Sequence, residues 1–279
     1  MKLTPEEKRI LSDNRSGSSE ILLSSVKYIQ RYLEYRSFRQ QAKDHIVLFL
    51  DALVTSFPAM AIIKNGSGKL EKILRSGGNK SVVDGITSFL KELEMIDNRI
   101  IENCRVLFKH KVSIVTYSNS GLVKKVLGCY RKMIKRVYVS ESRPDCEGRK
   151  MADHLDKMNI PVTYCIDMAL PTFLSKADYV ITGADGVGRT HFVNKTGTGV
   201  LLQLAGLNKV KRIVVFESLK RLKNTGKSVK RNISAKKTMR NKRLPCIIDF
   251  DNSIFESIPL EYVDFLISEK SIESNKNIR

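Results

Sequence analysis

The sequence predicts an α/β protein in which an N-terminal helical domain is followed by a Rossmann-like parallel sheet with helices on both faces. Residues 3–105 show apolar residues at helical spacing and no strand-like alternation. From residue 112 onward, short apolar runs alternate with helix-periodic segments, which is the pattern of βαβ units with parallel strands. We therefore expect a helical domain over residues 1–108 and a Rossmann-like domain over residues 109–279.

Four helices are expected in the helical domain, because apolar residues recur there every three or four positions. The second helix must stop before Pro58, since the residue before a proline is disfavoured in helical geometry. The third is expected to begin only after Gly66-Ser-Gly68. The predicted helices cover residues 20–33, 46–54, 69–74 and 82–104.

The Rossmann-like domain is expected to hold five parallel strands joined by helices. The strands are predicted at residues 112–117, 136–140, 162–166, 179–182 and 213–216. The helices are predicted at residues 121–134, 147–158, 168–174 and 200–207, followed by an extended piece at 247–250 and a final helix at 260–268. Because the strands are parallel, their carboxyl ends meet at one edge of the sheet, where ligands bind in such folds.

Residues 178–199 are expected to carry polar side chains to this edge. A short apolar run predicts a buried strand, and glycines on both sides of Asp185 allow the backbone to turn sharply after it. Asn194 and Lys195 end the loop, and Asn194 or Thr196 is expected to cap the helix that follows. The alternative interpretation is that Asp185 and Asn194 only hold their own loop in place.

The other strand ends add hydroxyl groups and cations. Ser118 and Ser120 precede a helix whose free N–H groups favour a phosphate, and Arg143, Asp167 and Lys220 follow three further strands. Each has a structural alternative, with Ser120 or Asp167 as a helix cap and Arg143 in a surface ion pair. The convergence of five strand ends predicts a pocket for a sugar phosphate or a nucleotide. The expected ligand-binding residues are Ser118, Ser120, Arg143, Asp185, Asn194, Lys195 and Lys220.

No motif of a metal site or a cofactor site stands out in the sequence. The four histidines lie far apart, and the cysteines lack zinc-ligand spacing. Gly66-Ser-Gly68-Lys69 departs from a Walker loop on both sides, and Gly183-Ala-Asp-Gly186-Val-Gly188 inverts the dinucleotide fingerprint. We therefore expect no metal and no cofactor.

The net charge of +20 is the most unusual bulk property of the sequence. Residues 219–243 form a basic loop with eleven basic residues and no acidic one. Such a charge favours contact with RNA, ribosomes or an acidic protein surface, although a solvated surface loop is the simpler alternative. The basic loop contains no aromatic residue, so base stacking is not indicated.

The cysteine pattern and the hydropathy predict a cytoplasmic protein. The five cysteines show no paired spacing, so free thiols in a reducing compartment are expected. No apolar run approaches the ~20 residues that span a membrane, and the N-terminal residues lack the hydrophobic core of a signal peptide.

Several motifs, taken together, resemble one known family. They include Val115-Thr-Tyr-Ser-Asn-Ser, the Glu141-Ser-Arg-Pro-Asp run, Ile160-Pro-Val-Thr, the strand and loop at 177–187, Asn194-Lys-Thr-Gly-Thr, Ser56-Phe-Pro and residues 65–74. The chain resembles the family that unites the alpha, beta and delta subunits of translation initiation factor 2B with ribose-1,5-bisphosphate and methylthioribose-1-phosphate isomerases. The resemblance covers nearly the whole chain and departs after Lys220, where the basic loop replaces the usual segment.

The resemblance also bears on catalysis. In the isomerases a cysteine and an aspartate act on the C1–C2 unit of the sugar, and the resemblance places Ser118 at the cysteine position and Asp185 at the aspartate position. A serine hydroxyl is a far weaker acid than a thiol, and nothing nearby in sequence suggests an activating base. The resemblance therefore implies a pocket kept for binding, without catalytic residues, although Asp185 is retained.

The resemblance implies a regulatory alpha-type subunit of the guanine-nucleotide exchange factor for initiation factor 2, since alpha subunits are short members of the family. The implied partners are a second copy of the chain, the other subunits of the complex, and phosphorylated initiation factor 2. The homodimer is expected through the Rossmann-like half, whose apolar run at 254–266 is rich for a chain end. Basic residues of the helical half, including Arg36, Arg39, Lys72 and Arg75, are expected to attract the phosphorylated client.

Two alternatives remain open. An isomerase acting on a phosphorylated pentose is the first, and the formation of a ketose phosphate by the chain alone would favour it. An RNA-binding protein that uses the basic loop is the second, and it predicts binding that falls steeply with salt.

Overall fold

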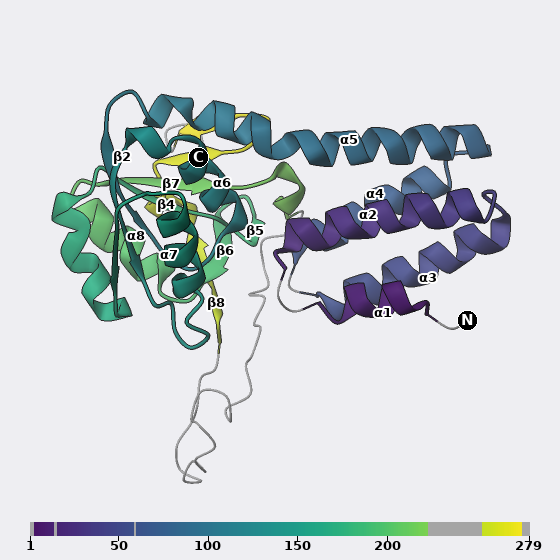
Figure 1. Ribbon diagram of the computed structural model, residues 1–279, viewed down its shortest axis with the longest axis horizontal. Helices are drawn as coiled ribbons and strands as arrows, with labels where there is room; N and C mark the ends of the chain where they lie inside the picture. The colour runs from purple at the N-terminus through teal and green to yellow at the C-terminus, as the bar shows by residue number, and fades with distance from the viewer. Residues whose placement is uncertain (1–2, 14–15, 59, 223–252, 275–279) are drawn as a thin grey trace, which may run out of the picture. The chain divides into compact units, whose positions relative to one another are not determined.

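Helices come first along the chain and a mostly parallel sheet flanked by helices follows, so the predicted α/β class is confirmed (Figure 1). This computed structural model describes residues 3–13, 16–58, 60–222 and 253–274. The predicted extended piece at residues 247–250 and the part of the basic loop at residues 223–243 lie outside the described residues. Within the described ranges, no helix is long and apolar enough to cross a membrane.

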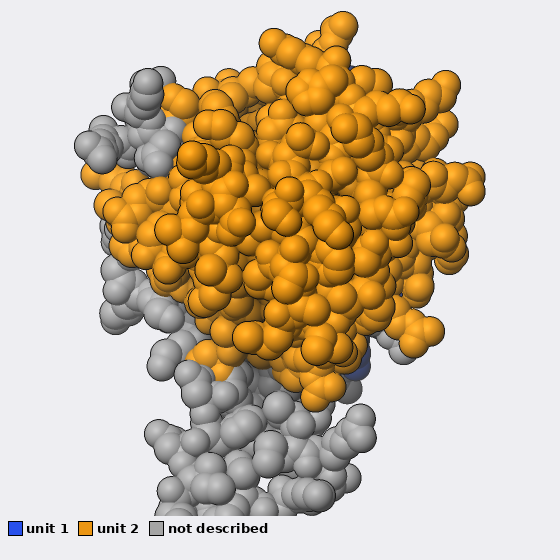
Figure 2. Space-filling view, turned by 90° about the vertical axis from the view of Figure 1, so that its left-hand side faces the viewer, with its two compact units in different colours: residues 1–99, 217–221 blue, residues 100–216, 222–279 orange. Residues whose placement is uncertain are grey.

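The chain divides into two units, which Figure 2 shows in different colours. The first, called the helical unit below, holds residues 1–99 and 217–221. The second, called the sheet unit, holds residues 100–216 and 222–279. The short segment 217–221 therefore belongs with the helices, although in sequence it follows a strand of the sheet.

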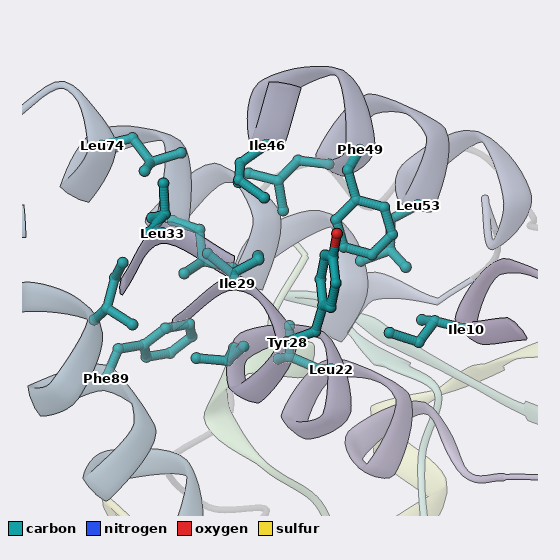
Figure 3. Packing of buried hydrophobic residues seen from close by; sticks show 14 of the residues in the cluster. Ile10, Leu22, Tyr28, Ile29, Leu33, Ile46, Phe49, Leu53, Leu74 and Phe89 are labelled. Atoms are coloured by element: carbon teal, nitrogen blue, oxygen red, sulfur yellow. The ribbon is translucent and has the colours of Figure 1, made fainter. Parts of the chain in front are cut away.

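The helical unit consists of helices that contribute buried residues to one apolar core. The helices are α1 (Pro5–Leu11), α2 (Ser18–Tyr35), α3 (Gln40–Ser56), α4 (Ala61–Leu74) and α5 (Asn79–Asn103), whose last residues belong to the sheet unit. In α2, Leu22, Ile29 and Leu33 recur at helical spacing and are fully buried. They share one core with Phe49 of α3 and Phe89 of α5 (Figure 3).

The predicted break at Gly66-Ser-Gly68 is wrong, because these residues lie inside α4. A Cβ atom at Gly66 would come within 2.5 Å of Leu22 Cδ1, so the absent side chain lets α4 approach α2 closely. A glycine inside a helix costs roughly 1 kcal/mol relative to alanine. The close packing of α4 on α2 explains why a glycine is nevertheless used there.

The sheet unit is built on a seven-stranded sheet with the order β10-β9-β7-β4-β1-β2-β3. Its strands are β1 (Val112–Thr116), β2 (Ile134–Ser140), β3 (Val162–Cys165), β4 (Tyr179–Thr182), β7 (Lys211–Val215), β9 (Phe265–Ile267) and β10 (Ile272–Ser274). All neighbours pair in parallel except β10 and β9. Every residue of β1 is buried, as is typical of a central parallel strand covered on both faces.

Within the part of the chain that the structure describes, three α-helices and several 3-10 helices accompany these strands. The α-helices are α6 (Gly121–Cys129), α7 (Gly148–Lys157) and α8 (Thr198–Leu207). The 3-10 helices are η1 (Cys104–Leu107), η2 (Arg131–Met133), η3 (Asp167–Lys176) and η5 (Leu260–Tyr262), and η4 (Ser218–Lys220) lies in the helical unit. The predicted helix at residues 168–174 is thus a 3-10 helix, and the one predicted at 121–134 ends at Cys129.

The predicted final helix at residues 260–268 is wrong. After η5 the chain forms β9, which pairs in parallel with β7 and sets Phe265 opposite Ile213. A short apolar run does not by itself distinguish a buried strand from a buried helix. The edge of β7 supplies the backbone partners that a strand requires, and this tertiary contact decides the structure.

The expected loop after β4 also contains regular structure. Residues 186–195 form a hairpin of β5 (Gly186–Val187) and β6 (His191–Lys195), and β6 pairs antiparallel with β8 (Phe255–Pro259). This second sheet places Glu256 opposite Asn194. Residues from the last part of the chain thereby reach the loop that the sequence marks as functional.

Candidate functional site

The end of β1 brings a serine hydroxyl into contact with a carboxylate. Ser118 follows β1 with a φ of 69°, a left-handed backbone conformation that residues other than glycine rarely adopt. Its N–H donates to Ser142 Oγ at 2.8 Å, and its Oγ donates to Glu147 Oε1 at 2.6 Å. Glu147 directly precedes α7. The first residue of α7, Gly148, packs closely on the end of β2, since a Cβ atom there would lie 1.8 Å from the Ser140 carbonyl oxygen.

A buried lysine contacts the same carboxylate. Lys195 is the last residue of β6, and its Nζ lies 3.2 Å from Glu147 Oε1. The side chain of Lys195 is 3% exposed, whereas that of Glu147 is 27% exposed. A buried ammonium group without a counter-charge is strongly destabilising, so Glu147 compensates the charge of Lys195. Ser118, Glu147 and Lys195 are called the Glu147 cluster below.

Asn194 connects three elements of the sheet unit. Its amide nitrogen donates to Thr182 Oγ1 of β4 at 2.6 Å and to Thr198 Oγ1 of α8 at 3.2 Å. The residue itself is buried. Asn194 therefore holds β6 against the end of β4 and the start of α8, and this contact fixes the position of the neighbouring Lys195.

The expected cap of α8 by Asn194 or Thr196 is wrong. The N-cap residue is Gly197, with a φ of 102° and no side-chain cap of its own. Glu256 of β8 caps the helix instead, because its Oε1 accepts the N–H groups of Gly197 at 2.9 Å and Gly199 at 2.8 Å. A carboxylate at the N-terminus of a helix also interacts favourably with the helix dipole.

Asp167 organises the turn that follows β2. Its carboxylate accepts hydrogen bonds from Ser140 Oγ at 2.6 Å, from the N–H of Ser142 at 2.8 Å and from the N–H of Arg143 at 2.8 Å. The residue Arg143 is exposed. Asp167 therefore fixes the backbone of the turn and leaves the guanidinium group of Arg143 on the surface.

Ser120 and Asp185 flank the end of β4. Ser120 caps α6, since its Oγ accepts the N–H of Val123 at 3.3 Å. A Cβ atom at Gly183 would lie 2.6 Å from Ser120 Oγ, so the glycine allows the end of β4 to approach the start of α6. Asp185 donates its backbone N–H to the Val193 carbonyl oxygen at 2.8 Å, and the residue is half-buried.

Lys220 belongs to the helical unit rather than to the sheet unit. Its Nζ lies 2.9 Å from Glu217 Oε2, and Glu217 also accepts a hydrogen bond from Ser19 of α2. Burial alone would raise the pKa of Glu217, but Lys220 and the hydrogen bonds from Ser19 and Lys220 outweigh it and hold the pKa below its usual range. The hydrogen bond from Ser19 of α2 to Glu217 helps to anchor the segment 217–221 on the helices.

Tyr117, which lies between β1 and Ser118, is largely buried and is influenced by three carboxylates. Its hydroxyl donates to the Thr196 carbonyl oxygen at 3.0 Å. Burial, together with the negative charges of Asp167, Glu147 and Glu256, raises the pKa of this hydroxyl above its usual range. The strand ends therefore gather three carboxylates as well as the predicted serines and the lysine.

Glu147 and Glu256 are functional candidates that the sequence did not indicate. Glu147 lies seven positions after Ser140, the predicted end of the strand, and is the first residue of the helix predicted at 147–158, so an acidic residue at the start of a helix was a usable signal. Glu256 lies 57 residues beyond Gly199 in an apolar run. No local pattern could have indicated its role as a cap. Among the described residues, no group of His, Cys, Asp and Glu could hold a metal ion.

The helical unit has a surface cavity of its own, of about 460 Å³, at the turn between α2 and α3. The Arg36 guanidinium carbon lies 5.9 Å from the ring centre of Tyr32 and 5.4 Å from that of Tyr35. The cavity is lined by Tyr32, Tyr35, Arg36, Ser37, Arg39, Gln41 and Ala42. The two arginines that line the cavity favour an anionic group.

Comparisons with known proteins identify related sequences. A model of the family described as IF-2B, the Initiation factor 2 subunit family, matches residues 15–272. Translation initiation factor eIF2B subunit alpha of Caenorhabditis elegans is 29% identical over 136 residues, which cover 48% of this chain and 45% of that protein. Ribose 1,5-bisphosphate isomerase of Archaeoglobus fulgidus is 23% identical over 273 residues, which cover 94% of this chain and 86% of the isomerase. The match to the alpha subunit thus spans less than half of its length.

Solved structures share the fold. The translation initiation factor eIF-2B of Pyrococcus horikoshii OT3 superposes with a TM-score of 0.80 at 21% identity, over 99% of this chain and 100% of that one. The 5-methylthioribose 1-phosphate isomerase of the same organism superposes with a TM-score of 0.81 at 17% identity, over 98% of this chain and 84% of that one. At these identities the likeness establishes the fold, which initiation factors and isomerases have in common.

Proposed function

The chain belongs to the Initiation factor 2 subunit family, and within it we propose a regulatory alpha-type subunit of the guanine-nucleotide exchange factor for initiation factor 2. Both initiation factor subunits and sugar-phosphate isomerases are among its relatives. The proposal therefore depends on what this chain's own site residues can do. Its pocket at the strand ends binds a sugar phosphate or a nucleoside monophosphate without turning it over.

The Glu147 cluster is the observation that carries this proposal. The family resemblance puts a catalytic thiol at the position of Ser118, and a serine hydroxyl gives up its proton far less readily than a thiol. This hydroxyl donates to Glu147, and Glu147 is also paired with the buried Lys195. The three groups satisfy one another, which suits a stable binding surface better than a proton-transfer site.

Affinity purification of the tagged full chain from its native cell tests the proposal. We expect the larger subunits of the exchange factor and initiation factor 2 itself to co-purify in stoichiometric amounts. Recovery of the chain alone, under conditions that keep other multi-subunit complexes intact, would contradict the regulatory role.

The cavity between α2 and α3 supports a role in sensing phosphorylation. A phosphoserine brings nearly two negative charges, and Arg36 and Arg39 both line this cavity. The assembled complex should bind phosphorylated initiation factor 2 more tightly than the unphosphorylated form. The double variant Arg36→Glu/Arg39→Glu should reduce that preference by about tenfold, whereas Lys80→Glu/Lys91→Glu, with the same change of charge on exposed positions, should leave it intact. Equal binding of both client forms by the unmodified complex would end this part of the proposal.

A homodimer through the sheet unit is also part of the proposal, but the apolar run at 254–266 does not provide its surface. Ile258, Val263 and Leu266 of that run are buried inside the sheet unit. Exposed apolar side chains lie instead at the β3 edge of the sheet, where Ile166 is 63% and Met168 86% exposed. Ile166→Asp/Met168→Asp should give monomers in sedimentation experiments at micromolar concentration, and Leu48→Asp on α3 should not. A wild-type chain that sediments only as a monomer would rule the dimer out.

An isomerase is the second candidate, and one contact favours it. The carboxylate of Glu147 lies 2.6 Å from Ser118 Oγ, so a proton acceptor is present that the sequence did not suggest. Assays of the chain alone with ribose 1,5-bisphosphate separate the two functions. We expect no turnover by the wild-type chain, and the Ser118→Cys variant tests whether the thiol is the missing group. Enzyme-like rates for the unmodified chain would favour the isomerase.

A further inference from the structure

The Glu147 cluster contains an anion that the protein supplies itself. Lys195 is the buried cation of the pocket, and a ligand phosphate would be expected to pair with it. Glu147 Oε1 already occupies that place, at 3.2 Å from Lys195 Nζ and 2.6 Å from Ser118 Oγ. The two donors that would recognise a phosphate oxygen therefore already bind a carboxylate oxygen.

Both contacts use the same oxygen of Glu147. Among the described residues, no hydrogen bond or ion pair reaches Oε2, and about a quarter of the side chain is exposed. A carboxylate oxygen accepts hydrogen bonds and donates none. The open side of the cluster is therefore an acceptor, which suits a ligand hydroxyl group.

The wider surroundings of the cluster are negative as well. Asp167 and Glu256 lie close enough to Tyr117 for their charges to act on its hydroxyl together with that of Glu147. Both carboxylates accept backbone N–H groups, and Asp167 accepts the hydroxyl of Ser140 as well. A phosphate dianion placed at the cluster would meet like charges, which is unfavourable, and the cation of the cluster, Lys195, is already paired with Glu147.

We propose that Glu147 is a specificity-determining residue that excludes phosphate from the Ser118–Lys195 corner and binds a sugar hydroxyl group there. The phosphate of the ligand then lies on the side of Ser120 and the exposed Arg143. The inference rests on the pocket of the proposed function and deepens it, because it assigns which end of the ligand each side of the pocket receives.

The Glu147→Gln variant of the full chain tests the inference with inorganic phosphate as the probe. Glutamine keeps the size of the side chain but removes its charge, so Lys195 is left without a counter-charge. In calorimetric titrations, Glu147→Gln should bind phosphate at least about tenfold more tightly than the wild type, since a charged hydrogen bond is worth roughly 1.5–3 kcal/mol. Glu141→Gln is the matched control, because Glu141 is a half-buried acid after the same strand and its replacement should change phosphate binding little.

Two further variants keep the test decisive. Glu147→Ala uncovers the same ammonium group and should show the same gain if glutamine disturbs folding. The double variant Glu147→Gln/Lys195→Met should lose the gain, because the cation is gone. Equal phosphate affinities of the wild type and both Glu147 variants would overturn the inference, and so would an equal gain in Glu141→Gln.

Ribose 5-phosphate separates this inference from the pocket proposal. If the wild type binds ribose 5-phosphate and the Glu147 variants gain no phosphate affinity, the pocket stands and the role of Glu147 is wrong. If the variants gain phosphate affinity while the wild type does not bind ribose 5-phosphate, Glu147 excludes phosphate as inferred and the sugar-phosphate pocket is wrong.

Discussion

Two acidic side chains show how differently the helical unit and the sheet unit use charge. In the helical unit, Glu7 of α1 is 0% exposed. Its carboxylate accepts the Tyr28 hydroxyl at 2.9 Å and the Thr4 N–H at 2.7 Å, and it lies 2.8 Å from His45 Nε2. In the sheet unit, Glu147 is 27% exposed and receives both of its contacts on one oxygen.

The comparison separates a structural carboxylate from one that is available to a ligand. Both groups are polar and largely buried, and both have partners, as buried polar groups require. Glu7 uses both oxygens to hold α1, α2 and α3 together. Glu147 uses one oxygen for both of its contacts among the described residues, and 27% of its side chain is exposed at the edge where ligands bind in parallel sheets. The degree to which a carboxylate is buried and hydrogen-bonded, rather than its charge alone, therefore indicates whether the acid has a structural role.

The largest effect is expected for Glu7→Ala. The change leaves His45 and the Tyr28 hydroxyl buried without their common partner, and breaking such a network costs roughly 3–5 kcal/mol of unfolding free energy. Glu6→Ala is the control, because the contacts of Glu6 with other described residues are exposed ion pairs with Arg9 and Arg31, worth less than about 1 kcal/mol. Urea denaturation measures both variants, and a loss for Glu7→Ala no larger than for Glu6→Ala would show that the enclosed network is not structural.

A smaller loss is expected for Asn65→Ala in the same unit. The Asn65 amide nitrogen donates to the carbonyl oxygens of Leu219 at 2.6 Å and Arg221 at 2.8 Å. Without the amide, both carbonyl oxygens lose this hydrogen-bond donor, which should lower the free energy of unfolding by about 1–3 kcal/mol. Asn208→Ala removes one exposed bond to Leu204 and should change stability by no more than about 0.5 kcal/mol. Comparable losses in the two variants would argue against anchoring of the segment 217–221 by Asn65.

Glu147→Gln should cost less than Glu7→Ala, about 1.5–3 kcal/mol, because Lys195 loses its counter-charge but glutamine still accepts hydrogen bonds and the side chain at position 147 is partly exposed. The comparison therefore predicts a variant that stays folded and changes its ligand preference. Thermal unfolding of the two variants side by side measures the difference. If Glu147→Gln destabilises the chain as much as Glu7→Ala, the distinction between an enclosed and an open carboxylate fails.

The smallest effect concerns the pH dependence of Asp264, which lies before β9. Its carboxylate binds Arg212 of β7 through hydrogen bonds of 2.8–3.1 Å. Burial alone would raise the pKa of Asp264, but the hydrogen bonds and the charge of Arg212 outweigh burial and hold the pKa below its usual range. A depressed pKa stabilises the fold above the ordinary value of about 3.9, and this contribution is lost as the pH falls through the lower, folded value.

Asp264→Asn should therefore lower the unfolding free energy near neutral pH by about 1 kcal/mol, since the ion pair is partly exposed. The difference from the wild type should shrink as the pH falls below the ordinary aspartate value. Asp156→Asn, at an exposed position of α7, should show no such pH dependence. A constant difference between Asp264→Asn and the wild type across the acid range would exclude this linkage.

The sequence alone determined the class of the fold and most of its elements. Apolar spacing in residues 20–33 and 82–104 predicted α2 and α5, and short apolar runs predicted β1, β2, β3, β4 and β7. These assignments succeeded because a helix stripe or a buried parallel strand leaves a local pattern in the sequence. The strand-end rule also led to Ser118 and Lys195, which the structure brings together around Glu147.

Tertiary structure decided what no local pattern contains. The run at 260–268 became β9 because the edge of β7 offered a strand partner, and Gly66 stayed inside α4 because Leu22 required the space. Glu256 caps α8, although it lies 57 residues from Gly199, because β8 pairs with β6. The open oxygen of Glu147 likewise depends on β1, β6 and α7 meeting at one point. Such contacts join residues distant in sequence, and only the folded chain determines which of their atoms remain available to a ligand.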